Sequence, residues 1–184
     1  MMNNPVMQWD ELNIIRNYAS EFFSRPRNRK EKERFCDYLD YVLCLIYMYG
    51  WEDAEKIVGI IPFVDGLDDR AVNHKIDGKT FRDRVMEDTT SDEILRLIDT
   101  EAHRDYNTAV YDAAKASGKD GIRKRWNTQQ DDRVREQHSY MDGMTVGLDD
   151  EFYTYTGEST LFPGGFGVPE LDCGCRCYVT LEIV

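Results

Sequence analysis

The chain has 184 residues, a formal net charge of −12, and 41% hydrophobic and 12% aromatic residues. This length suits one compact domain, alone or with an appendage, and the apolar content is enough for a folded core, which excludes wholesale disorder. The negative charge disfavours a simple nucleic-acid binder, because affinity for phosphate comes from clustered Lys and Arg side chains. We therefore expect basic or protein partners.

The first residues, MMNNPVMQWDELN, lack the basic start and the apolar centre of a signal peptide. The longest apolar run, residues 41–51, is about half as long as a membrane-spanning helix. We expect a protein that is made and kept in a reducing compartment, without a membrane anchor. In that compartment the five cysteines are expected to be free thiols or metal ligands before they are disulfides.

The N-terminal third of the chain is predicted to be helical. Apolar residues recur at every third or fourth position over residues 9–23, which predicts an amphipathic helix. A second apolar stripe over residues 35–49 predicts another helix, which Gly50 would end. A third, short helix is expected over residues 51–61, before Pro62.

Residues 64–78 are polar and rich in turn signals, and we interpret them as a loop and a domain boundary. The expected domains are a helical region, residues 1–63, and a second domain, residues 79–184. A helix is expected over residues 79–88, at the start of the second domain.

A long helix follows in the second domain. Thr90 and Glu93 form a candidate capping box at its beginning, and Gly118 is expected to end it. Between them, one face carries apolar residues at helical spacing: Ile94, Leu97, Ile98, Ala102, Tyr106, Ala109 and Ala113.

Beyond Gly121 the sequence alternates between apolar and polar residues, broken by Gly and Pro. Three short strands are predicted, with turns at the MDGMTVG and FPGGFGVP stretches; the strands are residues 122–128, 151–156 and 177–184. The predicted fold class is α+β, with N-terminal helices and a long helix packed on a small C-terminal antiparallel sheet.

Six short motifs follow one another in the second half of the chain. They are Thr100, Glu101, Arg104 and Asn107 in the long helix; Lys124 and Trp126 in a strand; Asp132, Arg133, His138 and Gly143; Glu151 with Phe152; FPGG; and Cys175, Arg176 and Cys177. In this order they resemble the phage Mu protein F-like family, also called the phage head morphogenesis or minor head protein family. The resemblance covers roughly residues 80–184, a little over half of the chain.

The chain departs from the family pattern at two places. Asp99 stands where the family helix often begins with Arg. Arg135 and His138 stand where some relatives have a C-x-x-C pair, and residues 172–175 read DCGC where those relatives have H-P-x-C. The first 80 residues lie outside the resemblance, so it implies nothing about the partner that they contact.

The resemblance implies a low-copy, capsid-associated component of a tailed-phage head. Such a protein assembles in the host cytoplasm with the portal, scaffold or major capsid protein and stays in the virion head, in some systems leaving with the DNA. No catalytic activity, sequence-specific nucleic-acid binding or membrane contact is implied. Some relatives carry fused toxin domains, for which 184 residues leave little room.

Two alternatives remain open at the level of sequence. One is a small metal-dependent hydrolase or nuclease-like effector carried in the phage head, with Glu101 as general base near a metal bound by His138. The other is an internal head protein that is ejected into the host, where its acidic surface could imitate nucleic acid.

The candidate metal ligands are His138 and the three clustered cysteines, Cys173, Cys175 and Cys177. Zinc prefers thiolate and neutral imidazole ligands in fours, and cysteines two apart on a strand share one face. A single structural zinc ion is therefore one interpretation. Buried thiols that pack as small hydrophobic side chains are another, and a redox role is a third, although a disulfide within C-x-C is strained.

Glu101 and Arg104 lie three residues apart on the long helix and can form an ion pair. We expect Asp132 and Arg133 to join them in a buried network beneath the sheet. A structural role is favoured over acid–base catalysis, because no nucleophile, phosphate loop or complete triad accompanies these residues. His74 and His103 have no partner visible in the sequence.

Overall fold

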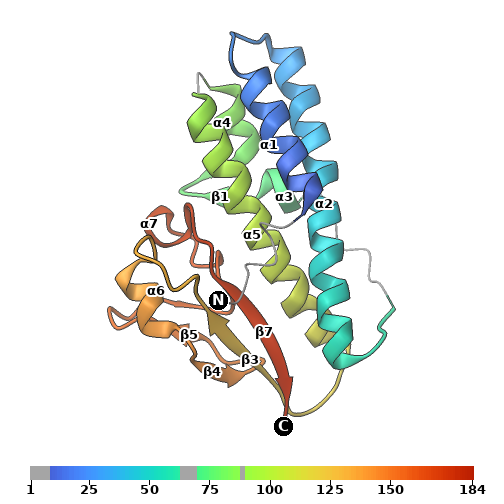
Figure 1. Ribbon diagram of the computed structural model, residues 1–184, viewed down its shortest axis with the longest axis vertical. Helices are drawn as coiled ribbons and strands as arrows, with labels where there is room; N and C mark the ends of the chain where they lie inside the picture. The colour runs from blue at the N-terminus through green and yellow to red at the C-terminus, as the bar shows by residue number, and fades with distance from the viewer. Residues whose placement is uncertain (1–8, 63–69, 88–89) are drawn as a thin grey trace.

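The computed structural model describes residues 9–62, 70–87 and 90–184. Three long helices lie side by side: α1 (Asp10–Phe22), α2 (Arg29–Val58) and α5 (Ser91–Ala116). A small sheet lies beside the C-terminal half of α5, and its strand β7 (Tyr178–Ile183) runs along that helix (Figure 1). The predicted α+β class is confirmed.

Helix α2 is longer than the apolar stripe predicts. It begins in a capping box formed by Asn28 and Glu31 and continues through Gly50 to Val58. The predicted end at Gly50 is therefore wrong, and the expected third helix is the last part of α2. A Cβ atom at Gly50 would lie 2.5 Å from the carbonyl oxygen of Tyr106 on α5. Glycine is present here because two helix backbones approach closely, which no larger residue permits.

Helix α5 confirms the predicted long helix and its boundaries. Thr90 and Glu93 form the capping box, the last helical residue is Ala116, and Gly118 adopts a positive φ of 60°. The apolar face packs against α2 in one continuous core, and its buried members include Ile94, Ile98, Ala102, Tyr106, Ala109 and Ala113. Among the described residues no helix has both the length and the apolar character needed to cross a membrane.

Short elements connect the long helices. They are α3 (Arg70–Asn73), the antiparallel pair β1 (Lys75–Ile76) and β2 (Lys79–Thr80), and α4 (Phe81–Met86). The helix expected over residues 79–88 is present as α4. Part of the expected loop, residues 64–69, lies outside the described residues, and the rest of that loop contains α3 and β1. The division into two domains stays a prediction.

The C-terminal sheet has the strand order β4-β3-β7, in which every neighbouring pair is antiparallel. Strand β3 (Ile122–Asn127) is central, between β4 (Thr145–Gly147) and β7, and Trp126 lies opposite Val179. Two of the three predicted strands are thereby confirmed. The third is short, because β5 (Phe152–Tyr153) pairs only with β6 (Ser159–Thr160).

Two helices in this region were not expected. Helix α6 (Glu136–Met141) and β4 occupy much of the stretch around the MDGMTVG turn. Helix α7 (Pro169–Asp172) follows the FPGG turn and precedes the cysteine-rich segment. Both helices are short, and short helices leave little periodic signal in a sequence.

Candidate functional site

The motif residues Thr100, Glu101, Arg104 and Asn107 lie on one face of α5, and all four are buried. Their spacing places them along one side of the helix, opposite the C-terminal segment, residues 163–179. We call this row of polar contacts the polar seam.

Asn107 joins α5 to the outer edge of β7. Its side-chain nitrogen donates a hydrogen bond to the carbonyl oxygen of Cys177 (3.1 Å), and its side-chain oxygen accepts one from the N–H of Val179 (2.9 Å). A neighbouring strand would make the same pair of bonds, so this one amide replaces a strand along that short stretch. The side-chain nitrogen also donates to the carbonyl oxygens of His103 and Pro163.

Glu101 and Arg104 form a buried ion pair, with 2.8 Å between Arg104 Nε and Glu101 Oε2. Arg104 also pairs with Asp105 at 2.6 Å, and His74 Nδ1 lies 3.7 Å from Glu101 Oε2. Burial alone would raise the pKa of Glu101, but Arg104 and His74 together bring that pKa below its ordinary value. Glu101 is therefore a bound carboxylate.

One expectation about this network is wrong. Asp132 and Arg133 are exposed and lie outside the buried network, which His74 and Asp105 join in their place. His74, whose partner is not visible in the sequence, faces Glu101. The sequence could not indicate this pairing, because the two residues come from different elements and are joined only by the tertiary fold.

The other end of the polar seam fixes the loop that leads into the cysteines. Thr100 Oγ1 accepts a hydrogen bond from the N–H of Gly174 (2.8 Å). The carboxylate of Asp172 accepts bonds from the N–H groups of Phe166 (3.1 Å) and Gly167 (2.6 Å). Burial raises the pKa of Asp172, and these two N–H groups oppose that effect. These contacts hold the residues that follow the FPGG turn against Asp172 of α7, and Gly174 against α5.

Lys124 and Trp126 of β3 point into the core beneath the sheet. Lys124 Nζ donates a hydrogen bond to the carbonyl oxygen of Leu148 (2.7 Å) and lies over the rings of Tyr111 and Phe152. Burial lowers the pKa of Lys124 to about 8. Trp126 packs edge-on against Phe152, with ring centroids 5.2 Å apart.

Two further motif residues have structural contacts. Gly143 adopts a positive φ of 79° and donates its N–H to the carbonyl oxygen of Trp126 (2.9 Å), so it forms the turn between α6 and β4. Arg176 forms a two-point ion pair with Asp131, at 2.7 and 2.8 Å. Asp131, which the sequence analysis did not single out, is thus the partner of Arg176.

A sulfur–imidazole cluster forms where α6 meets the C-terminal segment. His138 Nδ1 lies 3.6 Å from the sulfur of Cys175 and 3.5 Å from the sulfur of Cys177. All three ligand atoms lie within 4.8 Å of one another, and all three residues are buried. The imidazole ring is fixed by Trp126 and Phe166, which pack against it with centroid distances of 5.6 and 5.8 Å.

Cys173 does not join this cluster. It is half-buried, follows α7, and presents its carbonyl oxygen to the guanidinium group of Arg135. The structure therefore brings together three of the four candidate metal ligands. None of the five cysteines, all of which lie in the described part of the chain, forms a disulfide.

The cluster has a geometry that suits a zinc ion. With Zn–S bonds of about 2.3 Å and Zn–N bonds of about 2.05 Å at tetrahedral angles, nitrogen and sulfur ligands lie about 3.6 Å apart. Both Nδ1–sulfur distances have this value within 0.1 Å. A single ring nitrogen at equal distances from two sulfurs is also harder to explain by hydrogen bonds alone, because one nitrogen either donates or accepts one proton.

The electrostatics of the two sulfurs favour a negative charge at the cluster. A hydrogen bond from Cys177, together with His138, lowers the pKa of the Cys175 thiol, although burial opposes this. The same hydrogen bond raises the pKa of Cys177. This arrangement favours the thiolate form of Cys175, and thiolates are the form of cysteine that binds metals.

The family model described as phage Mu protein F like protein matches residues 67–180. The chain belongs to this family. In this chain, the motifs that resemble the family form the polar seam of α5, the Lys124–Trp126 pair of β3 and the cysteine-rich C-terminal segment.

Two known proteins are similar to this chain. NAD(+)--arginine ADP-ribosyltransferase EFV of Enterococcus faecalis is 34% identical over 147 residues, which cover 76% of this chain and 28% of that protein. Minor head protein GP7 of Bacillus phage SPP1 is 32% identical over 79 residues, which cover 42% of this chain and 26% of that protein. The chain thus spans less than a third of either relative. No solved structure matches it.

Proposed function

We propose that this protein is a minor head protein that acts in the assembly of a tailed-phage head, through contacts with the portal, scaffold or major capsid protein. Its family and its similarity to the minor head protein of phage SPP1 support a role in head morphogenesis. The observation that carries the proposal is that the motif residues of α5 are buried and bonded to one another or to the C-terminal segment, instead of lining an open site. They stabilise a structure, which is what an assembly protein requires.

The first two helices supply the docking surface in this proposal. Ile14 and Tyr18 of α1 and Tyr38 and Tyr41 of α2 are exposed. Tyr18 packs edge-on against Tyr38, with ring centroids 5.6 Å apart, so exposed aromatic side chains of the two helices are adjacent. Exposed apolar groups gathered in this way are typical of protein-binding surfaces. The protein would act in the host cytoplasm during assembly and remain in the virion head.

The sulfur–imidazole cluster would hold one structural zinc ion through His138, Cys175 and Cys177. Bound there, zinc would cross-link α6 to the segment that leads into β7, and its role would be structural and not catalytic. Cys173 would not be a ligand without a change in its loop, so the fourth position is open to a ligand from outside the cluster.

Native mass spectrometry tests the zinc site most directly. The purified protein is compared with Cys175→Ser and with Cys44→Ser, a matched change at a half-buried cysteine of α2 outside the cluster. We expect one zinc per chain in the parent and in Cys44→Ser, and none in Cys175→Ser. A folded parent protein without metal would make Cys175 and Cys177 packing residues and would leave the assembly role untouched.

Particle fractionation in the source host tests the assembly role. Proheads and mature virions are purified from a lysate and probed for this chain by quantitative mass spectrometry. We expect the protein in both particles at a copy number far below that of the major capsid protein. Its absence from both would overturn the proposed function whatever the metal content.

The rival function is enzymatic. The similarity to an ADP-ribosyltransferase favours transfer from NAD(+) to arginine, although this chain spans only 28% of that relative. A metal-dependent hydrolase with Glu101 as base has weaker support, because Glu101 is 2% exposed and bound to Arg104. Incubation with NAD(+) and an arginine-rich acceptor, and separately with DNA and divalent metal, measures both activities. Turnover in either assay would contradict a purely structural role.

A further inference from the structure

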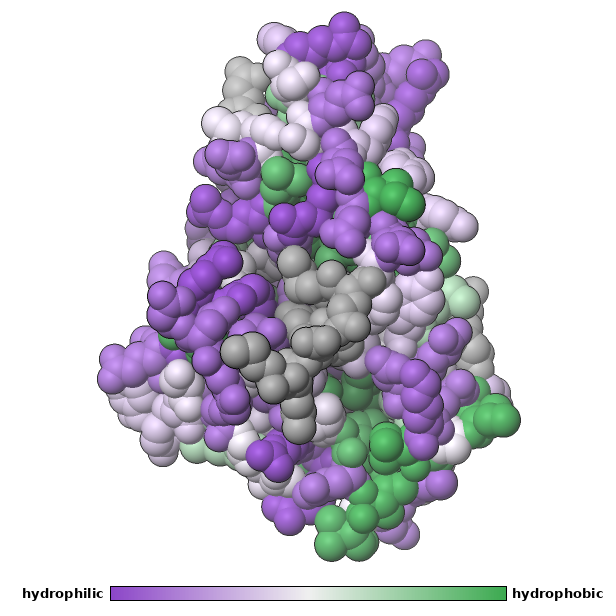
Figure 2. Space-filling view, in the orientation of Figure 1, coloured by the Kyte–Doolittle hydropathy of each residue, from purple (hydrophilic) through white to green (hydrophobic). Residues whose placement is uncertain are grey.

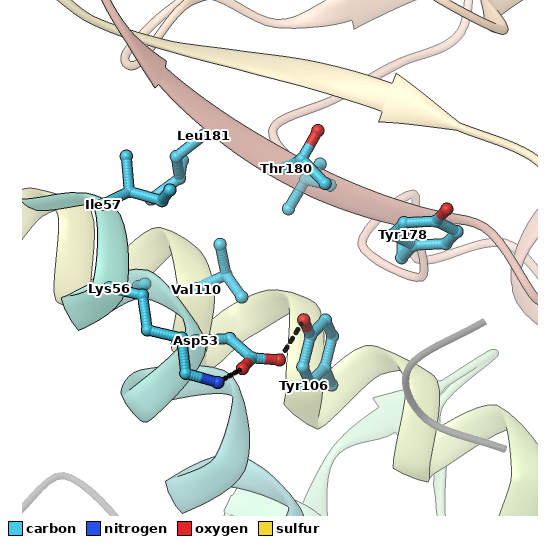
Figure 3. A pocket seen from close by; sticks show the side chains of 10 residues that line it. Asp53, Lys56, Ile57, Tyr106, Val110, Tyr178, Thr180 and Leu181 are labelled. Carbon is cyan, nitrogen blue, oxygen red and sulfur yellow. Dashed lines mark hydrogen bonds and ion pairs between the residues drawn. The ribbon is translucent and has the colours of Figure 1, made fainter. Parts of the chain in front are cut away.

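A cleft of about 460 Å³ lies between α2, α5 and β7, on the side of β7 that faces away from β3 (Figure 3). Its walls are mainly apolar and include Ala54 and Ile57 of α2, Val110 of α5, and Val179 and Leu181 of β7. A polar group lies at one side, where the hydroxyl of Tyr106 donates to Asp53 (2.9 Å) and Lys56 pairs with the same carboxylate (2.5 Å). The sulfur–imidazole cluster does not contribute to this cleft.

The strand that borders the cleft has an open edge. Strand β7 pairs with β3 on one side only, and the N–H of Val184 donates to the carbonyl oxygen of Gly121 (3.0 Å). Backbone groups alternate in direction along an antiparallel strand, so those of Val179, Leu181 and Ile183 point to the outer edge. Unpaired edges of this kind accept another strand.

Asn107 occupies only the beginning of this edge. Its amide bonds the carbonyl oxygen of Cys177 and the N–H of Val179, as an added strand would. Beyond Val179, within the described ranges, no hydrogen bond is made by the backbone of Leu181 or Ile183. The outer edge of β7 is therefore occupied at Val179 and open at Leu181, which lines the cleft, and at Ile183, which follows it toward the surface.

Exposed apolar side chains continue from the cleft onto the surface. Ile57 and Ile183 are 45% and 46% exposed, and Ile60 and Val184 are 96% and 83% exposed. Figure 2 shows hydrophobic side chains gathered at the lower end of the molecule, around the C-terminal parts of α2 and β7. A cleft, an open strand edge and an apolar surface thus coincide at one place.

We propose that this cleft binds an extended polypeptide segment of a partner protein, which adds to the outer edge of β7 beyond Val179. The open backbone groups of Leu181 and Ile183 select an extended chain. A helix uses its backbone N–H and C=O groups internally, so it would leave the groups of Leu181 and Ile183 unpaired. The apolar walls select a segment with apolar side chains at alternate positions.

The cleft is a second surface, distinct from the exposed aromatic side chains of α1 and α2. Strand addition at the cleft goes beyond the head-assembly role and does not depend on it. Two outward-facing residues, about 7 Å apart, suit an added stretch of roughly four or five residues.

The test uses the full chain and a short synthetic peptide with alternating Val and Thr and a Lys at each end. Isothermal titration measures binding, and NMR hydrogen exchange reports the Leu181 and Ile183 amides. A second peptide has the same side chains but carries N-methyl groups on its alternate backbone nitrogens. We expect saturable binding of the first peptide, exchange at both amides slowed about tenfold or more, and affinity at least about tenfold lower for the N-methylated peptide.

Two protein variants locate the site. Ile57→Glu places a charge on the wall of the cleft at an exposed position, so the fold should be kept, and we expect it to weaken peptide binding about tenfold. Ile14→Glu makes the same change at an exposed position of α1, outside the cleft, and should leave binding unchanged. Circular dichroism of both variants confirms that each is folded.

Three results would overturn the proposal. Failure of the alternating peptide to bind saturably would do so, because main-chain hydrogen bonds tolerate many side chains. Equal binding of the N-methylated peptide would show an apolar ligand cleft instead of strand addition. A protein that is dimeric without peptide, and that Ile57→Glu converts to a monomer, would show that a second copy of the chain occupies the cleft.

Discussion

The two faces of α5 hold their neighbours by different physical means. Toward α2, the contact is apolar and close, and Gly50 allows the two backbones to approach near Tyr106 and Ala109. Toward the C-terminal segment, the contact is made by buried polar side chains that bond particular backbone groups, with Asn107 as the clearest example. Apolar packing fixes distance and tolerates small shifts, whereas directional bonds fix position along the chain.

This difference explains how the sulfur–imidazole cluster can form. Cys175 and Cys177 lie between the Gly174 N–H, which bonds Thr100, and the Cys177 carbonyl, which bonds Asn107. A shift of the segment by one residue would reverse which side chains face His138, because side chains alternate along an extended chain. The polar seam therefore positions the two sulfurs before any metal is present.

Loss of the cation in the polar seam should have the largest effect. Arg104→Met removes the partner of two buried carboxylates, Glu101 and Asp105. We expect a loss of about 3–5 kcal/mol in the free energy of unfolding, measured by urea denaturation at pH 7, because uncompensated buried charges are costly. The double variant Glu101→Gln with Arg104→Met should recover part of that loss. A loss under about 1 kcal/mol would mean that the seam is solvated and contributes little.

The lowered pKa of Glu101 also gives the pH dependence its sign. A carboxylate whose pKa is lower in the folded protein contributes stability above its unfolded pKa, and that contribution is lost as the pH falls through the folded value. The parent protein should therefore become less stable as the pH is lowered below about 4.5. The difference between the parent and Glu101→Gln should shrink over the same range. A constant difference would contradict the pairing.

Asn107→Ala should have the next largest effect, about 2–4 kcal/mol, since it leaves the Cys177 carbonyl and the Val179 N–H buried without their partner. Thr108→Ala is the matched control, because the Thr108 hydroxyl bonds only within its own helix, to the carbonyl of Arg104. NMR hydrogen exchange should show faster exchange at Val179 in the first variant alone. Equal effects of the two changes would mean that Asn107 has no special part in holding β7.

Gly50→Ala tests the apolar face. In an ordinary helix this change stabilises a protein by roughly 0.5–1 kcal/mol, because alanine has the higher helix propensity. Here the new Cβ would meet the Tyr106 carbonyl oxygen at 2.5 Å, so we expect a loss of about 1–3 kcal/mol. The sign of the change in thermal midpoint is the measurement. A gain in stability would mean that the two helices can move apart at little cost.

Much of the apolar framework was predictable because it repeats along the sequence. The periodic stripes predicted α1, α2 and α5, and the capping box predicted where α5 begins. The end of α2 was missed, since Gly50 is equally suited to ending a helix and to a close crossing between helices, and only the position of α5 decides between them.

The site was predictable only in part. The cysteine spacing indicated that Cys175 and Cys177 share one face, and His138 was a candidate from its place in the motif. Cys173 lies apart from the cluster because of the turn that follows α7. The few residues of that turn do not determine its conformation from sequence alone. The pairing of His74 with Glu101 depends on how α5 meets a distant segment, and no local pattern encodes it.

Lys124→Met should have the smallest effect at pH 7 and a distinctive dependence on pH. Methionine has a similar shape, and replacing a buried cation by an apolar side chain is often neutral within about 1 kcal/mol. Burial lowers the pKa of Lys124 from 10.5 to about 8 in the folded protein, so between these values the unfolded chain binds more protons than the folded one. The stability of the parent, relative to the variant, should therefore rise as the pH increases from about 8 to about 10.5.

Urea denaturation of both proteins at closely spaced pH values measures this difference, and the comparison cancels tyrosines and cysteines that titrate in the same range. A flat difference would mean that the Lys124 ammonium group keeps its proton beneath the sheet, held by the Leu148 carbonyl and the rings of Tyr111 and Phe152. A rising difference would mean that the core beneath β3 tolerates a polar group chiefly when it is neutral. The polar seam, which holds charges in pairs, would then differ from the sheet core, which accepts a single titratable group.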